Sequence, residues 1–193
     1  MNKKLLIAVA LIWLAIGNCF SQTLPVPKGW EKEKFALPPV FAPTIPFKGS
    51  EDIRFSPEWA KKHTEGYWTY CFLWTIADAK ALSVTIFEKS LHDYYTCLIK
   101  TNLKGAKIDT TIATPVKVQL HKMAADKADR LAFEGKVEMM DYMTQDPIVL
   151  NFRIHVKRET YWGNFSAIFF EASPQPFSHK LWVEMDEIGK GIK

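Results

Sequence analysis

Apolar and polar residues alternate along the second half of the chain with the two-residue period of a β-strand. Such alternation is typical of strands that bury one face and expose the other, and turn-forming residues separate the alternating segments. The segments are residues 116–121, 133–139 and 148–156, followed by a more apolar run over residues 164–172. The pattern predicts an antiparallel β-meander with one dry face and one wet face.

Two other patterns predict a central strand and two helices. Residues 67–76 (YWTYCFLWTI) are apolar on both faces, which favours a strand that is covered on both sides. From Val84 to Thr101 apolar residues recur at steps of three and four, and Ser83 can act as the N-cap. This spacing predicts a long helix that covers the dry face of the meander. Residues 180–188 show the same spacing and predict a short second helix.

Proline and aromatic residues are concentrated before these elements. Residues 22–58 contain seven of the eleven prolines, and proline fixes φ and lacks a backbone donor, which predicts an extended, irregular segment. Its aromatic residues indicate that it is anchored. We therefore predict a proline-rich N-terminal arm over residues 22–66 and an α+β domain over residues 67–193. The domain is an antiparallel β-meander sheet packed against one long helix, and it forms one folding unit with the arm.

The first 21 residues have the layout of a secretory signal peptide. Two lysines precede an apolar run from Leu5 to Ile16, and small or polar residues follow up to Ser21. This run and every later one are shorter than the ~20 residues that span a bilayer. We therefore expect export to the periplasm or the extracellular space and no transmembrane segment. In an alternative interpretation Cys19 is the acylated terminus of a lipoprotein, although Asn18 is a poor residue before such a cysteine.

Cleavage would leave a nearly neutral chain with two cysteines. Without Lys3 and Lys4 the protein has 23 basic and 21 acidic side chains, a balance that argues against a nucleic-acid partner. Cys71 and Cys97 can pair in an oxidising compartment, or they can remain free thiols that pack as small apolar groups. The sequence leaves both possibilities open, because a disulfide depends on the separation of the two Cα atoms.

Histidine and glutamate on the wet face suggest one candidate metal site. His121, Glu134 and His155 lie on three of the predicted strands, and in a suitable register they could hold a metal ion with an open coordination position. The alternative, which we prefer, is a solvated pattern of opposite charges across strands.

Aromatic residues suggest a candidate binding cleft. Trp68, Trp74 and Trp162 belong to a set of rings that is large for a two-layer core. If some of them line a cleft between helix and sheet, it would suit an apolar or aromatic ligand or a carbohydrate ring. The preferred alternative is that these rings are the core, closed off by the arm.

Charged residues stand among apolar ones near the end of the arm. Buried charges must be paired, because an unpaired one costs several kcal/mol. Arg54 therefore either holds the arm through a carboxylate, Glu51 or another, or receives the anionic group of a ligand in a bidentate fork. We prefer the structural clamp and keep Arg54 as a candidate ligand-binding residue.

The segment FAPTIPFKGSEDIRFSP (residues 41–57), followed by YWTYCFLW (residues 67–74), carries a family resemblance. It resembles an uncharacterised family of secreted bacterial proteins with an FAPxIPFxGxEDxRFxP arm and an aromatic YWTYxFxW strand. The resemblance implies a secreted protein of one domain, and it implies no activity.

The sequence supports two classes of function. The first, which we prefer, is an exported non-enzymatic binding or envelope-accessory domain for an apolar ligand or a protein partner. The second is a metal- or carboxylate-dependent hydrolase with its site on the polar sheet face. No dedicated cofactor is predicted, because the sequence lacks glycine-rich phosphate loops and the GxSxG, HExxH and EF-hand motifs.

Overall fold

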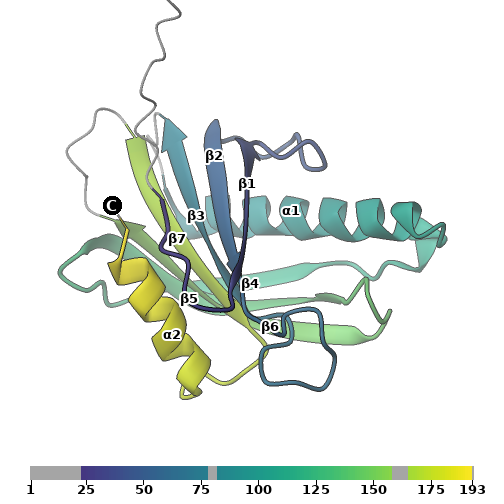
Figure 1. The fold of residues 1–193 in the computed structure, drawn as a ribbon. Helices are drawn as coiled ribbons and strands as arrows, with labels where there is room; N and C mark the ends of the chain where they lie inside the picture. The colour runs from purple at the N-terminus through teal and green to yellow at the C-terminus, as the bar shows by residue number, and fades with distance from the viewer. Residues whose placement is uncertain (1–22, 78–81, 158–164, 193) are drawn as a thin grey trace, which may run out of the picture.

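Seven strands form one antiparallel sheet in the order β1-β2-β3-β7-β6-β5-β4 (Figure 1). The computed structural model describes residues 23–77, 82–157 and 165–192. The predicted signal peptide, Cys19 and Trp162 lie outside these residues. The strands are β1 (Glu31–Leu37), β2 (Gly49–Phe55), β3 (Tyr70–Ala77), β4 (Lys117–Met123), β5 (Asp129–Met140), β6 (Pro147–Lys157) and β7 (Phe165–Ser173).

The two helices lie on opposite faces of the sheet (Figure 1). Helix α1 (Val84–Gly105) covers one face, and the hydroxyl of Ser83 accepts a hydrogen bond from the Ile86 amide at its N-terminus. Helix α2 (Lys180–Lys190) covers part of the other face next to β7, and a short 3-10 helix, η1 (Thr110–Ile112), follows α1. The α+β fold with an antiparallel sheet is therefore confirmed. None of the helices in the described residues is long and apolar enough to cross a bilayer.

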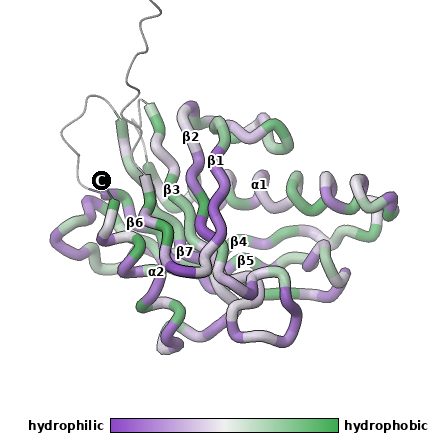
Figure 2. Tube along the Cα trace, in the orientation of Figure 1, coloured by the Kyte–Doolittle hydropathy of each residue, from purple (hydrophilic) through white to green (hydrophobic). Residues whose placement is uncertain are grey.

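The N-terminal arm supplies two strands that the sequence pattern did not reveal. β1 pairs with β2, and β2 pairs with β3, along their whole lengths. β1 has the sequence EKEKFAL and is largely exposed, and Figure 2 shows it in mostly hydrophilic colours. Its place in the sheet comes from backbone hydrogen bonds at an edge, which leave little trace in the apolar pattern.

The sheet is buried on both faces at its centre. On the side of α1, the apolar residues of β3, β7 and β6 pack against Phe87, Leu91 and Tyr95 of the helix. On the other side, Leu24 and Trp30 of the arm pack with the apolar face of α2. α2 and the arm therefore cover the centre of the predicted wet face, whereas its outer strands keep exposed positions, such as Val149 of β6.

The two cysteines of the described chain are free thiols. Cys71 belongs to the buried cluster on the α2 side of the sheet, whereas Cys97 lies on α1 and packs against the cluster on the opposite side. The sheet stands between them, so that the disulfide left open by the sequence does not form. Burial raises the pKa of the Cys71 thiol well above its usual value.

Candidate functional site

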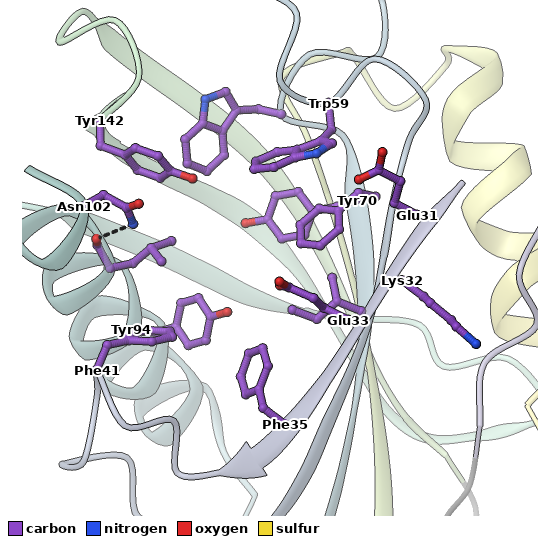
Figure 3. A pocket seen from close by; sticks show the side chains of 14 residues that line it. Glu31, Lys32, Glu33, Phe35, Phe41, Trp59, Tyr70, Tyr94, Asn102 and Tyr142 are labelled. Carbon is purple, nitrogen blue, oxygen red and sulfur yellow. Dashed lines mark hydrogen bonds between the residues drawn. The ribbon is translucent and has the colours of Figure 1, made fainter. Parts of the chain in front are cut away.

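A cleft of about 390 Å³ lies between β1, α1 and the loops at one end of the sheet. Aromatic rings make up most of its wall, and we call it the aromatic cleft. The sheet and α1 contribute four of its rings, those of Phe35, Phe55, Tyr70 and Tyr94 (Figure 3). The strand residues among them face α1 because alternate residues of a strand point to the same side of a sheet. The volume falls within the range of small-molecule sites.

Loops contribute the other four rings, and these rings support one another. Trp68 packs edge-on against Trp59 at 6.4 Å and against Tyr142 at 5.3 Å, and Trp59 packs on Phe55 at 4.6 Å. Phe41 completes the set by packing edge-on against Tyr94 at 5.1 Å. Such contacts stabilise the wall beyond simple burial. The cleft is therefore lined by rings that are held in place without a ligand.

Hydrogen bonds fix the loops that carry these rings. Trp68 adopts a positive φ of 51°, and its amide donates to the Trp59 carbonyl at 2.9 Å. The Tyr67 hydroxyl donates to Asp141, which also accepts the Met143 amide at 2.8 Å. This carboxylate thereby holds the turn that presents Tyr142 to the cleft.

Two carboxylates of the edge strand add negative charge to the cleft. Glu31 and Glu33 line it from β1, while the side chain of Lys32 between them points away (Figure 3). Both glutamates are exposed, as expected for an edge strand. Burial raises the pKa of Tyr142 to about 12, and the charges of Asp141 and, to a smaller extent, Glu33 add to the increase. The negative field of β1 is thus felt across the cleft.

A third carboxyl, Glu51, is buried beneath the cleft. It is 0% exposed, and the Tyr94 hydroxyl donates to its Oε1 at 2.9 Å. Burial raises its pKa to about 8, against the opposing effect of the Tyr94 and Trp74 side chains. Glu33 adds to the increase by charge repulsion. The protein therefore holds this group largely protonated at neutral pH.

The predicted ligand-binding tryptophans divide between the cleft and the core. Trp68 lines the cleft. Trp74 is fully buried and packs against Phe170 at 4.6 Å and Phe47 at 5.8 Å, so it belongs to the core. Trp162 lies outside the described residues. Trp68 therefore fits the prediction of a binding cleft, whereas Trp74 fits the alternative that the rings form the core.

Arg54 lies on the opposite face of the sheet and is directed at the protein itself. Its Nη1 and Nη2 contact the two carboxylate oxygens of Asp52 at 2.5 and 3.1 Å. The remaining donors bind backbone carbonyls: Nε that of Pro25 at 2.9 Å, Nη1 that of Ile53 at 2.7 Å, and Nη2 that of Leu24. This is the geometry of a clamp on the arm, with Asp52 rather than Glu51 as the carboxylate. All five guanidinium donors are used, which leaves none for a ligand's anion.

The predicted metal set His121, Glu134 and His155 is not brought together as a group. His121 lies across from Glu134, and its Nε2 is 3.2 Å from the Glu134 carboxylate at the exposed β4–β5 edge. The next strand places Arg153, not His155, opposite Glu134. The register decided this: the buried face fixes how β5 and β6 align, and that alignment places Arg153 between Glu134 and Glu171.

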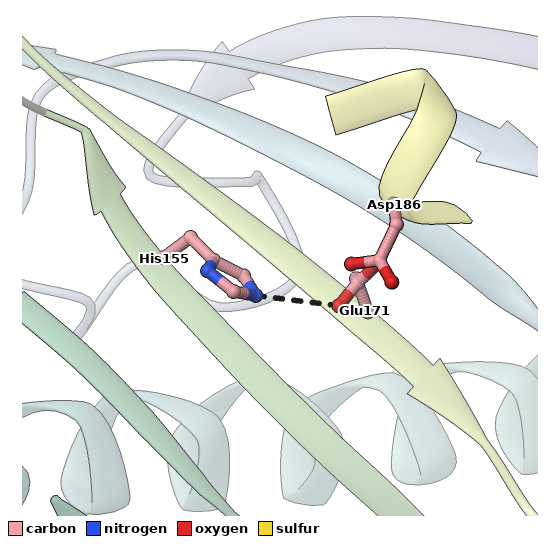
Figure 4. Close-up of side chains that lie close together, drawn as sticks. All are labelled: His155, Glu171 and Asp186. Carbon is pink, nitrogen blue, oxygen red and sulfur yellow. Dashed lines mark ion pairs between the residues drawn. The ribbon is translucent and has the colours of Figure 1, made fainter. Parts of the chain in front are cut away.

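His155 instead joins a cluster that the sequence patterns did not reveal. Its Nδ1 is 2.6 Å from Asp129, and its Nε2 is 3.4 Å from Glu171. One ligand atom each from His155, Glu171 and Asp186 lie within 4.8 Å of one another (Figure 4). We call His155, Asp129, Glu171 and Asp186 the histidine cluster. One signal was available in the sequence, because Glu171 is a lone charge in the apolar strand FSAIFFEAS.

Comparisons with protein families, with curated proteins and with solved structures found no match to this chain. The resemblance of residues 41–74 to a family of secreted bacterial proteins therefore stays a prediction. The functional interpretation rests on the geometry of the aromatic cleft and of the histidine cluster.

Proposed function

We propose that this protein is an exported, non-enzymatic binding domain whose aromatic cleft binds a small organic cation. The observation that supports this most directly is the combination of eight aromatic rings with the carboxylates of Glu31 and Glu33. The only basic side chain among the lining residues is that of Lys32, which points away from the cleft (Figure 3).

Two features of the cleft favour a cation. The faces of aromatic rings carry negative potential and attract an ammonium group, most strongly when water is excluded. A carboxylate at the mouth adds a charge of the same sign as the ring faces and draws a cation toward the cleft. An anion would meet repulsion from both, and a neutral apolar ligand would gain nothing from Glu33. The charges and ring faces of the cleft thus favour an apolar ligand that carries a positive charge.

Binding is favoured over catalysis by the residues that line the cleft. They are aromatic and aliphatic side chains, an amide, two carboxylates and a lysine, with no histidine, cysteine or serine among the described lining residues. Those three residue types are the usual source of a nucleophile or of a base that acts near neutral pH. The proposal of export rests on the signal-peptide pattern of residues 1–21.

The proposal can be tested by titrating the mature protein with choline and with 3,3-dimethylbutanol, its uncharged carbon analogue. Tryptophan fluorescence is a suitable signal, because Trp59 and Trp68 line the cleft. We expect choline to bind more tightly than the neutral analogue. Glu33→Gln should weaken choline binding about 3- to 10-fold, the range of one cation–carboxylate or cation–π contact.

A matched control is the neighbouring residue on β1. Lys32→Gln changes a charge one position away, but its side chain points out of the cleft (Figure 3). We expect it to leave the contacts of bound choline intact, and the loss of a nearby positive charge should not weaken binding. Equal affinity for choline and its neutral analogue would contradict the proposal. Binding of neutral sugars without binding of choline would instead identify a carbohydrate site.

A further inference from the structure

The histidine cluster lies where α2 meets the sheet, on the same sheet face as the His121–Glu134 pair but nearer to the centre of the sheet. His155 comes from β6, Glu171 from β7 and Asp186 from α2. In the β6–β7 register Arg153 faces Glu171 and His155 faces Phe169, so His155 and Glu171 are diagonal neighbours on the same side of the sheet. Three potential metal ligands thereby reach one point from three separate elements (Figure 4).

Glu171 provides an independent reason to look for a ligand here. Its side chain is 0% exposed, and neither carboxylate oxygen has a hydrogen-bond partner in the described part of the chain. A buried carboxylate without hydrogen bonds is costly, and such groups are normally paired or coordinate a metal. The His155 Nε2 lies 3.4 Å away but also lacks the alignment of a hydrogen bond. Both groups are therefore directed into the cluster with their polar atoms unsatisfied.

Asp129 orients the histidine from behind. Its Oδ2 is 2.6 Å from the His155 Nδ1, and Lys157 lies 2.9 Å from its Oδ1. A carboxylate that holds one imidazole nitrogen and leaves the other free is the usual outer partner of a metal-binding histidine. A β-bulge between Asp129 and Leu131 brings Asp129 opposite Lys157, on the side of the sheet where His155 lies.

The distances suit a small divalent ion. Two ligands of a tetrahedral ion with bonds of about 2.1 Å are separated by about 3.4 Å, and the His155–Glu171 separation is 3.4 Å. Asp186 completes three ligand atoms within 4.8 Å of one another, on a side chain that is 39% exposed and lies 3.8 Å from Arg153. A cavity of about 30 Å³ borders His155, Lys157 and Asp186 but not Glu171, and it has room for one water beside the cluster.

We propose that His155, Glu171 and Asp186 bind a divalent transition metal of the Zn²⁺ type, which joins α2 to the sheet. One imidazole and two carboxylates form a ligand set that suits Zn²⁺ better than Mg²⁺ or Ca²⁺, which prefer oxygen ligands alone. The site is separate from the aromatic cleft, so the two proposals stand or fall independently.

The side chains around the histidine cluster carry a net negative charge, which a bound cation would offset. Arg153 lies 3.8 Å from Asp186, but its guanidinium stacks over the rings of Phe177 at 4.7 Å and Trp182 at 5.2 Å. With neutral His155, the three carboxylates exceed the two cationic side chains, those of Arg153 and Lys157, by one negative charge. A bound divalent cation would offset this negative charge, and it would bind His155 in its neutral form.

The test uses the mature chain, treated with a chelator, dialysed and then titrated with Zn²⁺ in a calorimeter. We expect one site for each chain and a rise in Tm with Zn²⁺ that Mg²⁺ does not reproduce. Asp186→Asn, on the exposed side of the site, should lower Zn²⁺ affinity at least about 10-fold while the protein still folds. Glu171→Gln should lower it as well, and the visible absorption of bound Co²⁺ should report a low-coordinate site with a nitrogen ligand.

The matched control is a variant of His121, which forms an exposed pair with Glu134 on the same sheet face. His121→Ala removes a histidine that faces a carboxylate at 3.2 Å but lies outside the cluster, so it should leave Zn²⁺ affinity and the Tm shift unchanged. Three results would overturn the proposal: no Zn²⁺ binding, binding that Asp186→Asn and Glu171→Gln leave intact, or binding that His121→Ala abolishes. None of these results bears on choline binding in the aromatic cleft.

Discussion

Arg54 and Asp52, two residues apart on β2, form a buried ion pair that holds the start of the described chain against the sheet. Their side chains are 3% and 6% exposed. Asp52 accepts the Leu24 amide at 3.1 Å, and Arg54 donates to the carbonyl of Pro25 at 2.9 Å and to that of Leu24. The pair therefore satisfies backbone groups of a segment that forms no strand of its own.

Arg54→Ala should destabilise the protein by about 3–5 kcal/mol, because it leaves the Asp52 carboxylate buried without its partner. It should also release the segment around Leu24 and Pro25. Chemical denaturation would measure the free energy of unfolding, and hydrogen exchange of the Leu24 amide would report the release.

A surface ion pair of the same length serves as the control for this prediction. Lys62 and Asp146 are also 2.5 Å apart, but their side chains are 42% and 60% exposed. Lys62→Ala should cost less than about 1 kcal/mol, because solvent screens such pairs. If Arg54→Ala cost no more than Lys62→Ala, the clamp would be refuted and a ligand-binding role for Arg54 would reopen.

Stability should fall as the pH rises from 5 to 6.5 because of Glu51. Its pKa is about 8 in the folded protein and 4.5 as an ordinary glutamate. The folded state therefore holds a proton that the unfolded state loses in this window, and unfolding becomes easier as the pH rises. The contribution is fully present below pH 4.5 and lost by about pH 8. Over this interval of 1.5 pH units the change should be about 2 kcal/mol.

Glu51→Gln isolates this effect, because the amide keeps the shape of the protonated acid but does not titrate. We expect a shallower fall in stability between pH 5 and 6.5 for this variant, and the remaining slope comes from Glu171, whose pKa burial also raises. Glu33→Gln, which removes an exposed carboxylate of β1, should retain most of the slope, because burial rather than the charge of Glu33 is the main cause of the raised pKa of Glu51. The pKa of His155 is raised to about 9, because the hydrogen bond to Asp129 and the proximity of Glu171 outweigh burial. Titration of His155 therefore also lowers the free energy of unfolding as the pH rises, mainly above pH 6.5.

Cys71 and Cys97 should remain reduced after export. Alkylation of the unfolded protein without a reductant should modify both thiols, as read by mass spectrometry. In the native protein Cys71 should react far more slowly than Cys97, because it is fully buried and burial raises its pKa. A mass lower by two hydrogens, with no alkylation, would show a disulfide and contradict their placement on opposite sides of the sheet.

Gly135→Ala should weaken the pairing of β4 with β5. A Cβ atom at Gly135 would overlap the carbonyl oxygen of Gln119, which is backbone and has no room to yield. We expect a loss of about 1–3 kcal/mol, the usual cost of forced overpacking. Gly105→Ala is the control, since a Cβ there meets nothing within 4 Å at the end of α1. Equal stability of the two variants would show that β4 can shift without cost.

The amphipathic patterns of the sequence were sufficient to predict the helices and strands that bury apolar surface. The central strand, the long helix after Ser83, the meander and the short C-terminal helix all appear in the fold, although the strand predicted over residues 67–76 begins only at Tyr70. Each has a periodic apolar face, and that period reflects the geometry of the element itself. β1 lacks such a face because it is held by backbone hydrogen bonds at a sheet edge rather than by burial.

The sites depended much more on tertiary structure. The sequence pointed to His155 and Trp68 as functional candidates, but it grouped His155 with His121 and Glu134, whereas the fold pairs it with Asp129 and Glu171. A β-bulge in β5 decided the position of Asp129. The pattern of apolar residues does not predict where a strand contains the extra residue of a bulge.

By itself, the sequence determined the fold class and most of the secondary structure, because burial of apolar faces is local and periodic. It also pointed to export, through the pattern of residues 1–21. Only the tertiary structure decided which polar groups meet, because register, bulges and the docking of α2 depend on contacts between distant segments. The aromatic cleft and the histidine cluster each draw on at least three such segments, so neither could be assembled from the order of residues alone.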